Sequence, residues 1–195
     1  MAIELDGYRV ATTMRTPGND FELAVGFCHN EGLLDGHKVL EVKYCADGSA
    51  AATAFNIVTV STGGKAPEPR PRLATTTSSC GFCGTDEIDE LAAKLAPVTG
   101  DAVDWSVLAE APSTLRPTQD LFDATGAVHA AGVVDAEGGV VLAREDVGRH
   151  NAVDKIAGWM FREGVDGADK ILYTTGRLTS EMVIKTVHMG IPILV

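Results

Sequence analysis

Two cysteines, Cys80 and Cys83, are spaced as Cys-x-x-Cys in the run Ser-Ser-Cys-Gly-Phe-Cys-Gly. A predicted helix begins just after them at Thr85, and the partial positive charge of a helix start lowers the pKa of a nearby thiol. This arrangement favours a nucleophilic sulfur and predicts redox or sulfur-transfer chemistry. The alternative, half of a structural zinc site, requires a second cysteine pair. The other cysteines, Cys28 and Cys45, are isolated and are predicted to lie in the core.

A different chemistry is suggested by His29 and Glu31. His-x-Glu followed later by Cys-x-x-Cys is the pattern of zinc-dependent base deaminases, in which zinc activates water and the glutamate transfers protons. Two features disagree with it: Ser79 stands where a proline would precede the first cysteine, and the triplet ends a predicted helix instead of beginning one. We expect solvent-facing residues near a helix end, and a deaminase that uses His29 and Glu31 with Cys80 and Cys83 is an alternative.

Basic side chains gather in two predicted strand-to-helix turns, 144–151 and 174–181. Backbone N–H groups and the helix dipole favour an anion at a helix start, and arginine adds donors that clamp phosphate. Two such turns on neighbouring strands form a crevice typical of ligand sites in open α/β sheets. We therefore predict a site for a phosphorylated ligand. His129, in a predicted strand, is either a buried hydrogen-bonded histidine or a further member of that site. The candidate binding residues are Arg149, His150, Asn151, Gly176, Arg177, Ser180 and His129.

Hydrophobic periodicity and turn residues predict the elements that position these groups. Residues 1–60 are expected to form a β-α-β-β lobe whose helix starts at a capping box of Asn19 and Glu22. Residues 61–84 carry the two cysteines on a loop expected to be mobile, because Ser61–Ser79 has no hydrophobic period. Residues 85–195 are expected to form an α/β domain. The expected strands are Tyr8–Met14, Val39–Cys45, Thr53–Val60, Val128–Val134, Val140–Arg144, Ile171–Thr175 and Ile191–Val195.

The alternation of strands and helices predicts an α/β fold with a mixed sheet covered by helices. The formal net charge of -11 argues against binding to nucleic acid or to an anionic membrane surface, since both need a basic patch. The first residues lack the basic start and apolar run of a signal peptide, and no apolar stretch is long enough to cross a bilayer. These features predict a cytoplasmic protein.

Five runs of the sequence, taken in order, resemble the FdhD/NarQ family. Members of this family are formate dehydrogenase accessory proteins, which accept persulfide sulfur from a cysteine desulfurase and pass it to the molybdenum cofactor before that cofactor enters the enzyme. The resemblance implies a three-layer α/β fold similar to that of cytidine deaminase. The matching runs are Arg15–Ala24, Ser78–Gly84, Val128–Ala131, Arg144–Lys155, and Gly176-Arg177 with Ser180–Met182.

The resemblance also implies roles for individual residues. Cys80 would carry the persulfide and Cys83 would assist or resolve it, while the predicted crevice would hold the guanine-nucleotide phosphates of bis-molybdopterin guanine dinucleotide, which a guanine nucleotide would mimic. No metal ligand is implied. The expected partners are a cysteine desulfurase, formate dehydrogenase and a second copy of the chain, and a cofactor-binding chaperone without sulfur chemistry is a further alternative. Family chains begin upstream of Met1 and continue past the strand begun at Ile191, so we expect truncation at both ends.

Overall fold

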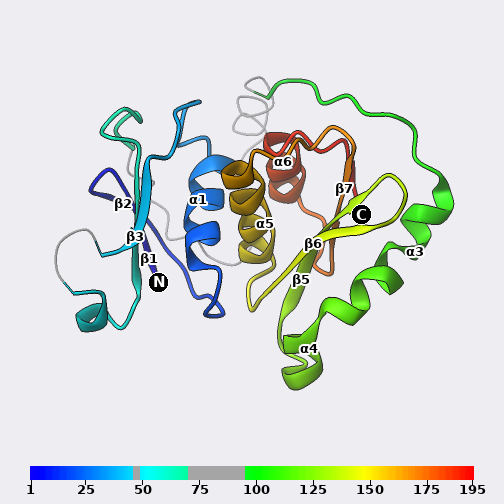
Figure 1. Ribbon diagram of the computed structural model, residues 1–195, viewed down its shortest axis with the longest axis horizontal. Helices are drawn as coiled ribbons and strands as arrows, with labels where there is room; N and C mark the ends of the chain where they lie inside the picture. The colour runs from blue at the N-terminus through cyan, green and yellow to red at the C-terminus, as the bar shows by residue number, and fades with distance from the viewer. Residues whose placement is uncertain (46–48, 70–94) are drawn as a thin grey trace.

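Two four-stranded sheets lie on either side of a central layer of helices in the computed structural model, which describes residues 1–45, 49–69 and 95–195 (Figure 1). The strand order is β2-β1-β4-β3 in the first sheet and β6-β5-β7-β8 in the second. The strands are β1 (Ala2–Leu5), β2 (Tyr8–Thr12), β3 (Glu41–Tyr44), β4 (Ile57–Ser61), β5 (His129–Asp135), β6 (Val140–Asp146), β7 (Lys170–Thr174) and β8 (Ile193–Leu194). The helices are α1 (Asp20–Asn30), α3 (Trp105–Leu115), α4 (Asp120–Thr125), α5 (Arg149–Glu163) and α6 (Ser180–His188), with short 3-10 turns at Ala50–Thr53 and Arg116–Thr118.

The first sheet is organised around β1, a strand that the hydrophobic pattern did not predict. It pairs antiparallel with β2 and parallel with β4, so this sheet is mixed. Ile3 and Leu5 alternate along β1 and are fully buried against α1, where Val25 and Cys28 belong to the same core. Four residues are too few for a period-2 pattern to stand out, although pairing on both sides makes this strand central.

The second sheet is organised around β5, which pairs antiparallel with both β6 and β7. Successive side chains of a strand point to opposite faces of a sheet. Val133 accordingly packs into the core formed with α5 and α6, whereas Val134 packs into a second core with Leu115 of α3. Helices therefore cover both faces of this sheet, which confirms the expected mixed α/β class. The likeness to cytidine deaminase and the expected domain boundaries stay predictions.

Helices α1 and α5 join the two halves through an unusually close backbone contact. A Cβ atom added to Gly26 of α1 would lie 1.8 Å from the carbonyl oxygen of Asp154, and one added to Gly158 of α5 would lie 1.8 Å from that of Glu22. Because atoms cannot approach so closely, the two glycines allow the helix backbones to touch. None of the helices in the described ranges is long and apolar enough to cross a membrane.

Three local expectations need correction. Asn19 lies in the left-handed region (φ 56°) and makes no side-chain cap, and the carboxylate of Glu22, its expected capping-box partner, pairs with Arg144. The strand expected from Thr53 begins at Ile57, after a 3-10 turn. Cys45 is only half-buried and follows β3 with φ 59°, so it is not a core residue.

The glycine contact can be tested by adding single methyl groups. Gly26→Ala and Gly158→Ala should each lower the free energy of unfolding by about 3 kcal/mol or more, because overpacking against backbone cannot be relieved by a rotamer change. Gly164→Ala is the control: its φ is +67° and its added Cβ meets nothing within 4 Å, so only the left-handed backbone costs about 1 kcal/mol. Urea unfolding measures all three, and equal losses would contradict the close contact.

Candidate functional site

The two predicted basic turns lie at the same edge of the second sheet. Strands β6 and β7 both run antiparallel to β5, so they run parallel to each other and their carboxyl ends meet at one edge. Helix α5 begins at Arg149 directly after β6, and α6 begins at Ser180 after β7. Since β5 runs the opposite way, its first residue, His129, lies at this same edge between the two turns.

Contacts between the turns bring His129, Arg149 and the segment 174–180 together at the place where the sequence predicts the crevice. The His129 Nδ1 atom lies 3.4 Å from the Thr175 hydroxyl. A Cβ added to Gly176 would lie 2.7 Å from the Arg149 side chain, so the lack of a side chain at Gly176 leaves room for Arg149. The structure therefore brings together residues that were predicted separately from two distant motifs.

Two buried polar atoms of this crevice have no hydrogen-bond partner among the residues that the structure describes: Arg149 Nε and Thr179 Oγ1. Buried donors without partners are uncommon, and a ligand or ordered water is the usual explanation. Arg177 is exposed, and Ser180 is half-buried at the start of α6. Together these groups can bind an oxyanion, with guanidinium and hydroxyl donors beside the start of two helices.

Asn151 has a different environment from the other predicted binding residues. It is buried, and its side-chain amide donates to the Met14 carbonyl at 2.7 Å and to Asp146 Oδ1 at 2.9 Å, while its oxygen accepts from the Thr13 hydroxyl at 3.2 Å. The structure thus places Asn151 in a link between the start of α5 and the segment after β2. No long-range contact of this kind can be inferred from the spacing of residues in the sequence.

The histidines beside the crevice are affected by burial and by nearby arginine. Burial and the positive charge of Arg149 lower the pKa of His129. Burial also lowers the pKa of His150, against the opposite effect of Glu181, whose carboxylate lies 2.9 Å from its Nε2 atom. Both side chains are therefore neutral near pH 7, and the positive charge of the crevice comes from its arginines.

His29 and Glu31, the residues of the deaminase alternative, are in contact with α6. The His29 Nε2 atom lies 2.9 Å from the His188 carbonyl oxygen, and Glu31 pairs with Lys185 at 3.5 Å. His29 is half-buried, which corrects the expectation that it faces solvent. In the described ranges no three His, Cys, Asp or Glu side chains are grouped as metal ligands.

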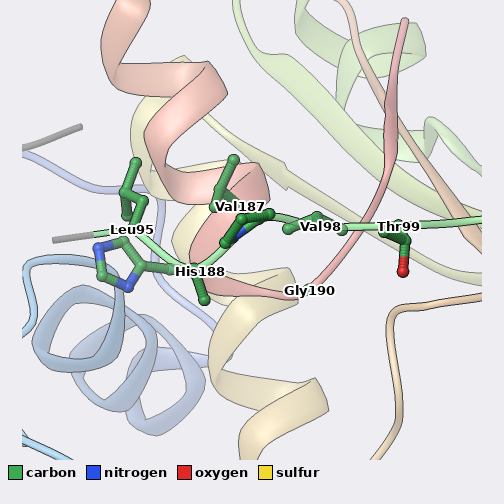
Figure 2. Close-up of a pocket in the computed structure, with 8 residues that line it drawn as sticks. Leu95, Val98, Thr99, Val187, His188 and Gly190 are labelled. Atoms are coloured by element: carbon green, nitrogen blue, oxygen red, sulfur yellow. The ribbon is translucent and has the colours of Figure 1, made fainter. Parts of the chain in front are cut away.

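Cys80 and Cys83, and the helix expected after them, lie outside the described residues. Leu95 is the first described residue that follows this segment, and it lines a hollow of about 470 Å³ together with Val187 and His188 at the end of α6 (Figure 2). Cys28 is fully buried, and burial with the charge of Asp154 raises the pKa of its thiol. A buried thiol with a raised pKa is a poor nucleophile.

The described residues define an α/β protein in which two arginine-bearing turns lie at the carboxyl ends of two strands of one sheet. Its sequence matches the FdhD/NarQ family over residues 1–195, and the chain belongs to this family.

The chain resembles named members of that family over its full length. It is 39% identical over 201 residues to the sulfur carrier protein FdhD of Nocardia farcinica, covering 100% of this chain and 71% of that protein. It is 40% identical over 203 residues to the sulfur carrier protein FdhD of Mycolicibacterium paratuberculosis, covering 100% and 75%. A crystal structure described as a formate dehydrogenase accessory protein from Desulfotalea psychrophila superposes with a TM-score of 0.73 at 26% identity, covering 99% of this chain and 71% of that chain.

The proximity of His129 and Arg149 predicts a titration effect. Arg149→Ala should raise the pKa of His129, because it removes a positive charge that disfavours the imidazolium. Burial remains, so the pKa should stay below its ordinary value. Nuclear magnetic resonance titration of the His129 ring signals measures the change, with Arg162→Ala near the far end of α5 as control. An unchanged His129 pKa in Arg149→Ala would show that the charge of Arg149 does not act on His129.

Proposed function

We propose that this chain is a sulfur carrier that accepts persulfide sulfur from a cysteine desulfurase and transfers it to bis-molybdopterin guanine dinucleotide, before that cofactor enters formate dehydrogenase. The observation that carries the proposal is the crevice in which His129, Arg149 and the 174–180 turn converge, with Arg149 Nε and Thr179 Oγ1 buried and unpartnered among the described residues. Membership of the FdhD/NarQ family and the names of its relatives support the sulfur chemistry.

The crevice would hold the guanine-nucleotide phosphates of the cofactor, which is the substrate of the transfer. Arg149 and Arg177 would supply charge-assisted donors, and a planar guanidinium can contact two phosphate oxygens at once. Because His129 is neutral near pH 7, it would act as a hydrogen-bonding group beside the phosphates and not as a charge. Gly176 allows the backbone of the second turn to approach the ligand and Arg149 closely.

Sulfur would pass through Cys80 and Cys83 in two successive displacement steps. The Cys80 thiolate attacks the terminal sulfur of the desulfurase persulfide, so that a new sulfur–sulfur bond forms at Cys80 and the desulfurase cysteine leaves as a thiolate. The Cys83 thiolate then attacks the Cys80 sulfur, which forms a disulfide and releases hydrosulfide to the cofactor. The two thiols supply both electrons, and a thiol reductant must restore them. The desulfurase, the enzyme served and a homodimer remain predicted partners.

Nucleotide binding tests the crevice. Arg149→Ala and Arg177→Ala should each weaken binding of guanosine diphosphate at least about tenfold, because losing a charge-assisted contact costs about 1.5–3 kcal/mol. Calorimetric titration measures the affinity, and Arg162→Ala is the control because it removes the same charge away from the crevice. Unchanged affinity in both crevice variants, with a parent chain that binds, would place the nucleotide elsewhere.

Sulfur loading tests the cysteines. After incubation with a desulfurase and cysteine, mass spectrometry should find the added sulfur on the parent chain and not on Cys80→Ala. Cys28→Ala and Cys45→Ala should load normally, Cys28 because its thiol is buried. Cys83→Ala should load sulfur but release less hydrosulfide, because the attacking thiolate is missing. A chain that binds nucleotide but never loads sulfur would favour the chaperone alternative, and equal loss in all three alanine variants at 28, 45 and 80 would refute the role of Cys80.

A further inference from the structure

The turn at the start of α5 is organised by one fully buried carboxylate, that of Asp146. Its Oδ1 atom accepts from the Gly148 N–H at 2.9 Å and from the Asn151 amide at 2.9 Å. Its Oδ2 atom accepts from the Thr16 N–H at 3.0 Å and pairs with Lys155 Nζ at 2.8 Å. Donors from the turn, from α5 and from the segment after β2 therefore meet at a single side chain.

Thr16 and Lys155 complete this arrangement, which we call the Asp146 network. The Thr16 hydroxyl accepts from the Val147 N–H at 2.9 Å, and the Thr16 carbonyl accepts from Lys155 Nζ at 3.1 Å. The same Nζ atom donates to the Glu145 carbonyl at 3.0 Å. The N–H groups of Val147 and Gly148 are thus directed inward, while the next N–H groups, at the start of α5, have no partner within the helix.

We propose that Asp146, Lys155 and Thr16 are positioning residues, which hold the 147–149 turn in the conformation that receives phosphate. This inference rests on the proposed function of the crevice. It assigns a role in the ligand site to Thr16, a residue that precedes α1 and comes from the first half of the chain. Each of the three acts through the turn and not by touching the ligand.

Charge alone predicts the opposite effect for Asp146. Its carboxylate is a negative charge close to an anion site, so its removal should strengthen phosphate binding if electrostatics dominates. Lys155 holds that charge in a buried pair, with side chains 2% and 0% exposed. If positioning dominates, removing the carboxylate weakens binding even though the site becomes more positive. The sign of the effect therefore distinguishes the two explanations.

A second buried pair with one member in α5 supplies a matched control. Asp154 pairs with Lys185 at 2.8 Å and accepts from Asn30 at 2.8 Å, with carboxylate and ammonium exposed by 2% and 6%. Burial lowers the pKa of Lys185, but Asp154 and Glu31 outweigh that effect and raise it above its ordinary value. This pair joins α5 to α1 and α6 and makes no contact with the turn. Asp154→Asn thus removes an equally buried charge without touching the network.

The experiment compares Asp146→Asn with Asp154→Asn in the full chain. At position 146 an amide offers one acceptor oxygen where the carboxylate offers two. In either orientation its NH₂ group faces two donors, those of Gly148 and Asn151 or those of Thr16 and Lys155, so only one of these pairs keeps its hydrogen bonds. Asp146→Asn should therefore bind guanosine diphosphate and inorganic pyrophosphate at least about tenfold more weakly than the parent. Its affinity for guanosine, which lacks phosphate, should not change. Asp154→Asn should match the parent for all three ligands.

Each outcome has a defined meaning. If Asp146→Asn binds the diphosphate as well as Asp154→Asn does, or more tightly, the positioning role is wrong. The proposal that the crevice binds phosphate is then unaffected. An equal loss for guanosine and the diphosphate would also overturn it, since that indicates general damage to the fold. A parent chain that binds neither the diphosphate nor pyrophosphate would overturn the crevice and this inference together.

Thr16→Val keeps the proposal testable if Asp146→Asn does not fold. Valine has nearly the same shape as threonine and keeps both backbone contacts of Thr16, but it removes the acceptor for the Val147 N–H. The diphosphate affinity should fall severalfold while guanosine affinity and the unfolding midpoint change little. Thr186→Val, which removes a buried hydroxyl bonded to the Met182 carbonyl at 2.6 Å within α6 and not to the turn backbone, is the matched control. Equal diphosphate affinity in the two variants would refute the role of Thr16.

Discussion

The backbone contact between α1 and α5 sets the positions of the other elements. Gly26 and Gly158 allow α1 and α5 to pack in direct backbone contact. Because α1 packs against the first sheet and α5 against the second, this contact fixes the position of one sheet relative to the other (Figure 1). The short distance also determines which polar groups can meet across the junction. Glu22 of α1 reaches Arg144 of β6 through two contacts of 2.6 and 2.8 Å, and Asn30 reaches Asp154. A wider separation of the helices would leave these buried groups without partners.

Buried ion pairs restrict how α5 can pack at its contact with α1. Ion pairs of this kind add little net stability, because desolvation offsets their attraction, but breaking one leaves an uncompensated charge at a cost of about 3–5 kcal/mol. Asp154 and Lys155 occupy neighbouring positions of α5 and pair with different segments, Lys155 with Asp146 of β6 and Asp154 with Lys185 of α6. Alternative packings of α5 would separate at least one pair. The junction therefore admits few other arrangements, and the segment containing Thr16 is held against the turn at the start of α5.

Local patterns in the sequence predicted much of this fold. The apolar positions of α5, the hairpin of β5 and β6 and the two basic turns all follow from periodicity and turn residues, since they depend on neighbours in the chain. Strand β1 was missed because four residues carry too little pattern, and Asn19 was misjudged because Glu22 has a distant partner. The crevice residues were predicted as separate turns, whereas the roles of Thr16 and Asp146 depend on contacts between segments that no local pattern contains. Cys80 and Cys83, identified by their spacing, lie outside the described residues.

The Asp146 network matters for ligand binding because the chain has a net charge of -11, which opposes the approach of an anion. A ligand that carries phosphates is repelled at long range by such a chain, although salt screens this repulsion beyond about 8–10 Å. Histidines cannot offset it, because burial keeps His129 and His150 neutral near pH 7. Affinity for the proposed ligand would then come from short-range contacts with guanidinium and N–H groups, and such contacts are strongest when their geometry is established before binding. A carboxylate that orients the turn, neutralised by its own lysine, provides that geometry without adding net charge at the site.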